Sequence, residues 1–197
     1  MANVLRIDTE RTWEDAAAAD VRDRLVRSWG AHHVTALRGP DVVPANVDAA
    51  VPGADLVTAS GHGEYSCFLG TTLEPVWADH ASRGLLAGKV VHLLACRSAV
   101  ALGTELVRAG VVAFWGYTAD FQLERDHLDL LLGMDAELLD GLLSGCDAEQ
   151  VHQCVTAYLA DAMNLPLSAP VRERLVSNYA SLARPGSPWG DGSAVVR

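Results

Sequence analysis

Two continuous apolar segments, at 54–60 and 88–96, constrain the fold more than any other feature of this sequence. Neither segment alternates polar with apolar residues, so each predicts a strand that is covered on both faces. Such strands belong to a parallel sheet with helices packed on either side. The first segment is followed by His62, and the second ends in Cys96. Each predicted strand therefore leads into a chemically reactive side chain.

Strand and helix patterns alternate along most of the chain. Strands are predicted at 3–9, 32–39, 54–60, 88–96 and 111–121, and helices at 11–30, 42–53, 98–110, 124–145, 147–164 and 169–184. The alternation predicts an α/β fold with a mostly parallel central sheet, to which the last three segments add extra C-terminal helices. One domain is expected over 1–184. The remaining segment, 185–197, is rich in proline, glycine and serine and is predicted to be a flexible tail.

Helix-capping residues support two of these helices. Thr12 is expected to cap the first helix, with Glu14 and Asp15 in its first turn. Asp147 followed by Gln150 resembles a capping box at the start of the fifth helix.

Composition narrows the partners and the compartment. The formal net charge of −10 repels phosphate backbones, so we expect no nucleic-acid partner. No apolar run approaches the roughly 20 residues of a membrane span, and the N-terminal segment lacks the pattern of a signal peptide. A cytoplasmic protein without membrane contact is therefore expected. The four cysteines, Cys67, Cys96, Cys146 and Cys154, form no Cys-x-x-Cys pair, which argues against a zinc site or a disulfide framework.

His62 and Cys96 together suggest nucleophilic catalysis. If their strands are parallel neighbours, the strand ends lie roughly 5–10 Å apart at one edge of the sheet. A free thiol has a pKa near 8.5, and a neighbouring imidazole can take its proton. The helix predicted at 98–110 would point its positive end at the sulfur. Backbone N–H groups of Gly63 and Cys96 are candidate donors to an oxyanion, and a glycine at 63 lets a substrate backbone approach.

The two motifs in their order resemble a known family. The segment LVTASGHGE, followed by KVVHLLACRSAVALGTELVRAGVVAFWGYTADF, is similar to the caspase-like cysteine peptidases, above all to bacterial caspase-like and CHAT-type domains; the resemblance covers about residues 54–121. It implies a three-layer caspase-like sandwich and a thiol protease that needs no metal or organic cofactor. His62 carries over as the base or proton donor and Cys96 as the nucleophile. The N–H groups of Gly63 and Cys96 carry over as the oxyanion hole.

Three further residues are candidates for substrate binding. Asp120 follows the strand after the cysteine strand, in a region that borders the substrate pocket in this family. An acid there favours arginine or lysine before the scissile bond, although a solvated turn aspartate is the alternative. Glu64 is a second such acid, and Tyr117 either lines the pocket or packs in the core. Leu94 stands where eukaryotic caspases have a glutamine that helps to hold an aspartate side chain, so strict cleavage after aspartate is not expected.

These observations lead to one main hypothesis and two alternatives. The main hypothesis is a cysteine endopeptidase that cleaves a protein or peptide substrate through a Cys-His dyad and an acyl-enzyme. By analogy it would serve a bacterial stress or defence pathway, and a regulatory partner protein is compatible with it. The first alternative is a non-catalytic caspase-like scaffold or regulatory module. The second is a small hydrolase or transferase that uses the same thiol on an ester or amide.

Overall fold

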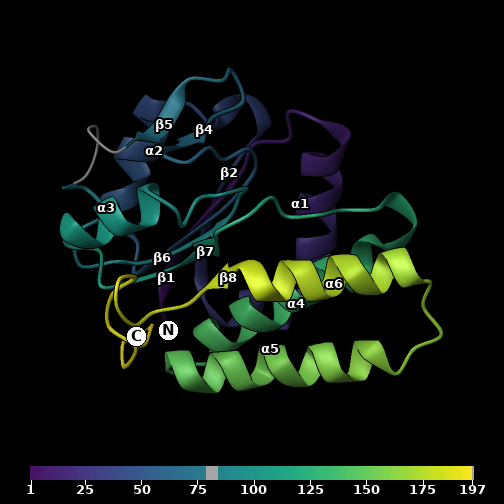
Figure 1. Cartoon of the computed structure of the whole chain (residues 1–197). Coiled ribbons are helices and arrows are strands. Elements are labelled where there is room, and N and C mark those ends of the chain that lie inside the picture. The colour runs from purple at the N-terminus through teal and green to yellow at the C-terminus, as the bar shows by residue number, and fades with distance from the viewer. Residues whose placement is uncertain (79–83, 197) are drawn as a thin grey trace.

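The protein has an α/β fold built on a mostly parallel sheet. The structure, a computed structural model, describes residues 1–78 and 84–196 (Figure 1). The sheet has the order β2-β1-β3-β6-β7-β8. Its strands are β1 (Asn3–Asp8), β2 (His33–Arg38), β3 (Leu56–Ser60), β6 (Val90–Leu94), β7 (Ala113–Tyr117) and β8 (Leu182–Ala183). All neighbouring pairs are parallel except β7 with β8, which is antiparallel. The predicted fold class and parallel sheet are confirmed.

Helices cover both faces of this sheet. The described residues form six α-helices: α1 (Trp13–Leu25), α2 (Pro44–Ala50), α3 (Leu102–Arg108), α4 (Leu128–Leu143), α5 (Ala148–Met163) and α6 (Ala169–Ser181). They also form the 3₁₀ helices η1 (Arg27–Ala31), η2 (Gly39–Asp41), η3 (Val51–Gly53) and η4 (Arg125–His127). One apolar cluster joins one sheet face to α1, α4 and α5, and a second joins the other face to α2 and α3. Figure 1 shows the C-terminal helices α4, α5 and α6 as one packed group.

Strand burial explains the continuous apolar segments. In β3, Leu56 belongs to the cluster under α1 and α4, whereas Val57 belongs to the cluster under α2 and α3. In β6, Val90 and Val91 divide in the same way. All five residues of each strand are buried, as a parallel sheet covered on both faces requires.

Both predicted helix starts are confirmed. Thr12 and Asp15 form a capping box at α1, and Asp147 and Gln150 form one at α5. The first helix is shorter than predicted, because Val26 leaves the helical conformation and places its side chain in the core. Residues 27–31 continue as a 3₁₀ helix.

The antiparallel elements were not predicted from the sequence. β4 (Cys67–Leu69) and β5 (Pro75–Ala78) form a separate two-stranded sheet after the His62 turn, and β8 pairs with the end of β7. These strands have two to four residues each, too few to show an alternating pattern.

The C-terminal segment contacts the sheet instead of leaving the domain. The Phe114 N–H donates to the Trp189 carbonyl oxygen, and the Trp189 indole donates to the carbonyl oxygen of Ala99. Val196 is buried in the cluster under α4 and α5. These contacts cross the boundary drawn at residue 184, whereas the flexibility of the segment stays a prediction.

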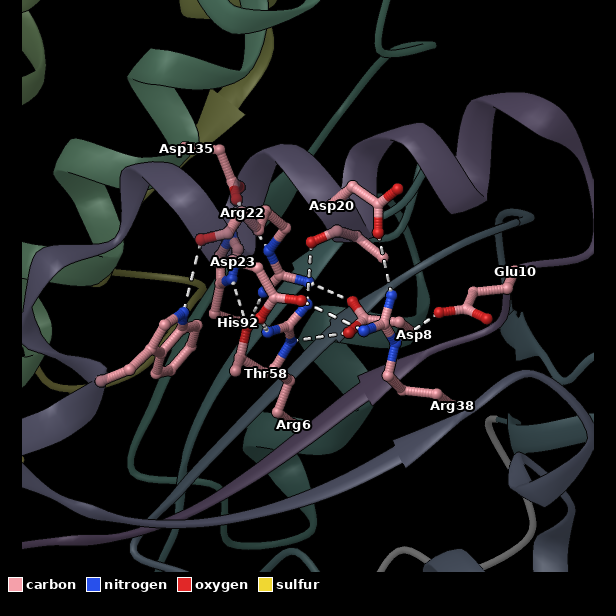
Figure 2. A network of polar contacts seen from close by, with 12 residues as sticks. Arg6, Asp8, Glu10, Asp20, Arg22, Asp23, Arg38, Thr58, His92 and Asp135 are labelled. Atoms are coloured by element: carbon pink, nitrogen blue, oxygen red, sulfur yellow. Dashed lines mark hydrogen bonds and ion pairs between the residues drawn. The ribbon is translucent and has the colours of Figure 1, made fainter.

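A charged network lies buried between α1, α4 and the sheet (Figure 2). Arg22 of α1 contacts Asp8 of β1 at 2.9 Å and Asp135 of α4 at 3.4 Å, and all three side chains are fully buried. Arg22 also donates to Thr58 of β3. Buried ions are tolerated only when they are paired and hydrogen-bonded. Here the buried guanidinium of Arg22 faces the carboxylates of Asp8 and Asp135.

His92 of β6 is a member of this network. Its Nδ1 lies 3.0 Å from the Thr58 hydroxyl, and its Nε2 lies 2.9 Å from Oδ1 of Asp135. Because a carboxylate can only accept, Nε2 carries a proton. His92 is therefore a buried core histidine whose two ring nitrogens both face polar side chains.

Within 1–78 and 84–196, no helix is both long enough and apolar enough to cross a membrane.

Candidate active site

The structure brings His62 and Cys96 to the same pocket. β3 and β6 are parallel neighbours, and Ser60 pairs with Leu94 in their register. His62 and Cys96 each follow these paired residues by two positions, so both leave the sheet at its carboxyl edge. Both line a pocket of about 300 Å³. The expectation that the two strands are adjacent and parallel is confirmed.

Three parts of the chain surround this pocket: the start of α1, the ends of β3 and β6, and the segment after β7. Its lining residues are Thr12, Glu14, Asp15, Ala18, Ser60, Gly61, His62, Leu94, Ala95, Cys96, Phe121 and Leu123. The floor combines apolar and polar groups, which is the usual composition of a ligand site.

Position 63 must be a glycine because the backbone at Ala95 and Cys96 packs directly against it. A Cβ atom at this position would lie 2.5 Å from the carbonyl oxygen of Cys96 and 2.8 Å from the Cβ of Ala95. The glycine therefore lets the two strand exits approach each other, a reason that is independent of any substrate. This close packing also fixes the position of Cys96 relative to the His62 turn.

The predicted oxyanion donors differ in their surroundings. Gly63 faces Phe68 in an isolated antiparallel bridge whose hydrogen bonds are made by the flanking residues. Across the part of the chain that the structure describes, the Gly63 N–H has no backbone hydrogen-bond acceptor, whereas the Cys96 N–H faces its own sulfur. Their role as an oxyanion hole stays a prediction.

The resting Cys96 thiol is not activated by its surroundings. Burial raises the pKa of the Cys96 thiol, and the carboxylate of Asp120 raises it further. The Phe121 N–H and the Arg97 guanidinium act in the opposite direction but do not offset the burial. Since only a thiolate is a good nucleophile, this cysteine needs a base.

The helix after Cys96 does not supply the expected activation. The prediction that it begins at Ser98 is wrong: α3 begins at Leu102, and residues 98–101 form turns. The Ser98 hydroxyl accepts a hydrogen bond from the Tyr117 N–H instead of capping a helix. The positive end of α3 is thereby displaced from the sulfur along the chain.

His62 contacts a carboxylate that the sequence analysis did not assign to the site. Its Nε2 lies 3.3 Å from Oδ2 of Asp15, in the first turn of α1. Among the described residues, no hydrogen bond joins His62 to Cys96 directly. The thiol and the imidazole thus share one pocket without forming an ion pair in this structure.

The predicted substrate residues are not brought together at this pocket. The Asp120 carboxylate accepts a 2.8 Å hydrogen bond from Arg97. Glu64 is exposed in the segment between β3 and β4, and neither Asp120 nor Glu64 lines the pocket. Tyr117 is fully buried, with its ring packed edge-on against Phe121 at 4.8 Å, so it is a core residue here. Asp120 therefore matches the alternative of an exposed aspartate, here paired with Arg97, and its role in substrate binding stays a prediction.

Other residues that line the pocket were missed. The sequence predicts Glu14 and Asp15 only as helix-start acids, and it predicts no role at the site for Phe121 or Leu123. One signal was present: a helix that follows a parallel strand begins at the carboxyl edge of the sheet, where the site lies.

Replacing Asp120 by asparagine is expected to lower the pKa of the Cys96 thiol. The substitution removes a negative charge that disfavours the thiolate and leaves the cation of Arg97 in place. At pH 7 the rate of Cys96 alkylation by iodoacetamide should rise about two- to fivefold. Peptide mapping by mass spectrometry over time measures this rate. Asp126→Asn, which removes an exposed carboxylate of η4, is the control; an unchanged or slower rate in Asp120→Asn contradicts the assignment.

Comparison with known proteins adds no relative to this picture. No protein-family model matches the chain, and no curated protein matches its sequence. The functional argument therefore depends on the geometry of the site and on the resemblance of its two motifs.

Proposed function

We propose that this protein is a cysteine peptidase with Cys96 as the nucleophile and His62 as the general base. The observation that carries the proposal is the paired exit of β3 and β6 into one pocket, with a histidine and a cysteine at equivalent positions. The resemblance of both motifs to caspase-like and CHAT-type domains supports it, and with it a three-layer caspase-like sandwich and a bacterial origin. We place the activity in the cytoplasm, where a thiol stays reduced.

The proposed reaction follows from the chemistry of these groups. His62 takes the proton of the Cys96 thiol, and the sulfur attacks the carbonyl carbon of the substrate. The oxygen of the tetrahedral adduct becomes an anion, which the N–H groups of Gly63 and Cys96 would stabilise. The His62 imidazolium then gives its proton to the leaving amine as the C–N bond breaks. Water, deprotonated by His62, attacks the thioester, and hydrolysis releases the acid and restores the thiol.

The pocket supports a preference for a basic substrate side chain. Glu14 lines it and, among the described residues, has no cationic partner. Phe121 and Leu123 supply an apolar wall. An arginine or lysine side chain matches this combination, because its methylene stem packs on apolar surface while its charge meets the carboxylate. Glu14 takes the role in this proposal that the sequence analysis gave to Asp120.

A positional peptide library tests the proposal. Wild-type protein is incubated at pH 7–8 with the library, and products are read by mass spectrometry; cleavage after arginine or lysine is expected. A peptidyl acyloxymethyl ketone with lysine next to the warhead should modify Cys96, as located by peptide mapping. Cleavage without modification of Cys96 would refute the site, and turnover of small esters alone would favour the small-acyl hydrolase.

One observation favours the non-catalytic alternative. The raised pKa of the Cys96 thiol and the contact of His62 with Asp15 together describe a site with a protonated thiol at rest. In a non-catalytic scaffold the Cys96 thiol would stay protonated whichever peptide is added. Equal labelling of Cys96 and Cys146 by the peptidyl ketone, with no cleavage, would support the scaffold over the peptidase.

A further inference from the structure

The contact between His62 and Asp15 joins the pocket to the start of α1. The Nε2 atom of His62 is inaccessible to solvent, although the ring as a whole is 42% exposed. Oδ2 of Asp15 lies 3.3 Å from it, and the Asp15 side chain is 9% exposed. Among the described residues, Nε2 has no other polar neighbour at hydrogen-bond or ion-pair distance. One ring nitrogen thus faces a buried carboxylate, and the rest of the ring faces the pocket.

Helix α1 holds this carboxylate in place. The N–H of Thr12 donates to Oδ2 of Asp15 at 3.1 Å, and the Asp15 N–H donates to the Thr12 hydroxyl at 3.3 Å. These reciprocal bonds form the capping box that begins the helix. The same oxygen, Oδ2, meets both the Thr12 N–H and the imidazole. Asp15 therefore presents a fixed acceptor to His62.

A fixed acceptor selects the histidine tautomer. A carboxylate accepts but does not donate, so the nitrogen that faces it carries the proton. The other nitrogen, Nδ1, then has a free lone pair. We propose that Asp15 is a positioning residue that holds His62 in the Nε2–H tautomer and leaves Nδ1 as the base for Cys96. This inference rests on the proposed peptidase function, and it adds a third residue to the two that the sequence motifs supply.

Two variants separate orientation from charge. Asp15→Asn with its amide oxygen in the place of Oδ2 still accepts from the Thr12 N–H and keeps an acceptor beside Nε2 of His62, but it has no charge. Asp15→Ala has no acceptor at all. We expect kcat to fall about tenfold in Asp15→Asn and about 10²–10³-fold in Asp15→Ala, with KM nearly unchanged. Rescue by asparagine relative to alanine is the signature of a positioning role.

The capping box requires a matched control. Gln150 occupies the same third helical position in the capping box of α5, and within 1–78 and 84–196 it forms no hydrogen bond with a histidine. Gln150→Ala therefore removes a comparable helix cap away from the pocket. It should lower the unfolding midpoint about as much as Asp15→Ala while leaving kcat unchanged. An equal loss of kcat in both variants would show that Asp15 acts through folding alone and would overturn the proposal.

A spectroscopic readout decides the role of Asp15 without turnover. The ¹⁵N chemical shifts of the His62 ring, measured on labelled protein at alkaline pH, distinguish the two tautomers. Wild type and Asp15→Asn should show the proton on Nε2, whereas Asp15→Ala should lose this preference. An unchanged tautomer in Asp15→Ala overturns the inference. A wild type that cleaves no peptide but shows the Asp15-dependent tautomer refutes the peptidase proposal and leaves the positioning contact established.

Discussion

Replacing Cys96 by alanine is expected to abolish peptide hydrolysis while leaving the fold intact. In the proposed mechanism the acyl-enzyme forms on this sulfur, so no covalent intermediate is available without it. A loss of about 10⁴-fold or more in kcat is expected. The side chain lies at the pocket and is only partly buried, and its sulfur interacts with the backbone N–H of Phe121 alone among the backbone groups of the other described residues, so the unfolding midpoint should change little. Kinetics with the best library peptide measure the first effect, and thermal unfolding measures the second.

The other cysteines and histidines of the chain provide matched controls. Cys154→Ala removes an exposed thiol of α5 and should retain full activity. His62→Ala should lose nearly as much as Cys96→Ala, and the double variant should lose little more, because the two groups act as a unit. His33→Ala removes an exposed imidazole on β2 and should have no effect. Additive losses in the double variant would contradict a shared catalytic step.

Replacing Asp135 by asparagine is expected to destabilise the protein by about 3–5 kcal/mol, the usual cost of breaking a buried ion pair. Its carboxylate contacts His92 at 2.9 Å and Arg22 at 3.4 Å, and none of the three side chains is accessible to solvent. An amide would leave the Arg22 charge with one carboxylate, Asp8, instead of two. Urea unfolding at pH 7 measures the difference in free energy.

The effect of pH on this loss has a definite sign. Burial alone would raise the pKa of Asp135, but the nearby His92 and Arg22 side chains lower it below its usual value. A carboxyl with a depressed pKa in the folded state stabilises the protein above its unfolded pKa, near 3.9, and this contribution is lost as pH falls through the folded value. The gap between wild type and Asp135→Asn should therefore shrink in acid. A gap that widens with acid would show that Asp135 is not ionised in the folded protein.

Asp129→Asn is the control for this experiment. Asp129 lies on the same helix and pairs with Arg24, but both side chains are more than half exposed. An exposed pair contributes little, so the variant should differ from wild type by less than about 1 kcal/mol. Equal losses of unfolding free energy in Asp129→Asn and Asp135→Asn would show that the buried network stabilises the fold no more than an exposed ion pair does.

The sequence predicted the parallel sheet because burial on both faces leaves a direct pattern. Segments 54–60 and 88–96 are mostly apolar and do not alternate, since each strand serves two cores, and their adjacency follows from the usual order of such folds. The places of His62 and Cys96 followed from the same rule. The short strands β4 and β8 were missed because so few residues carry no periodicity.

The surroundings of the site were harder to predict, since they depend on which loops meet. For Asp120 the sequence left a pocket acid and a solvated turn aspartate open, and the structure pairs its exposed carboxylate with Arg97. Asp15 resembles any helix-start acid in the sequence. Only the placement of α1 over the strand exits shows that its carboxylate faces His62.

The candidate active site and the buried ion network share structural elements, which ties the proposed catalysis to the integrity of the core. Helix α1 carries Asp15 at its start and the buried Arg22 near its end, and β6 leads from His92 to Cys96 within four positions. Arg22 anchors this helix to three other elements. Fraying of α1 alone would leave the buried carboxylates of Asp8 and Asp135 without the Arg22 cation. The loss of activity on heating and the thermal unfolding of the whole protein should therefore follow the same curve.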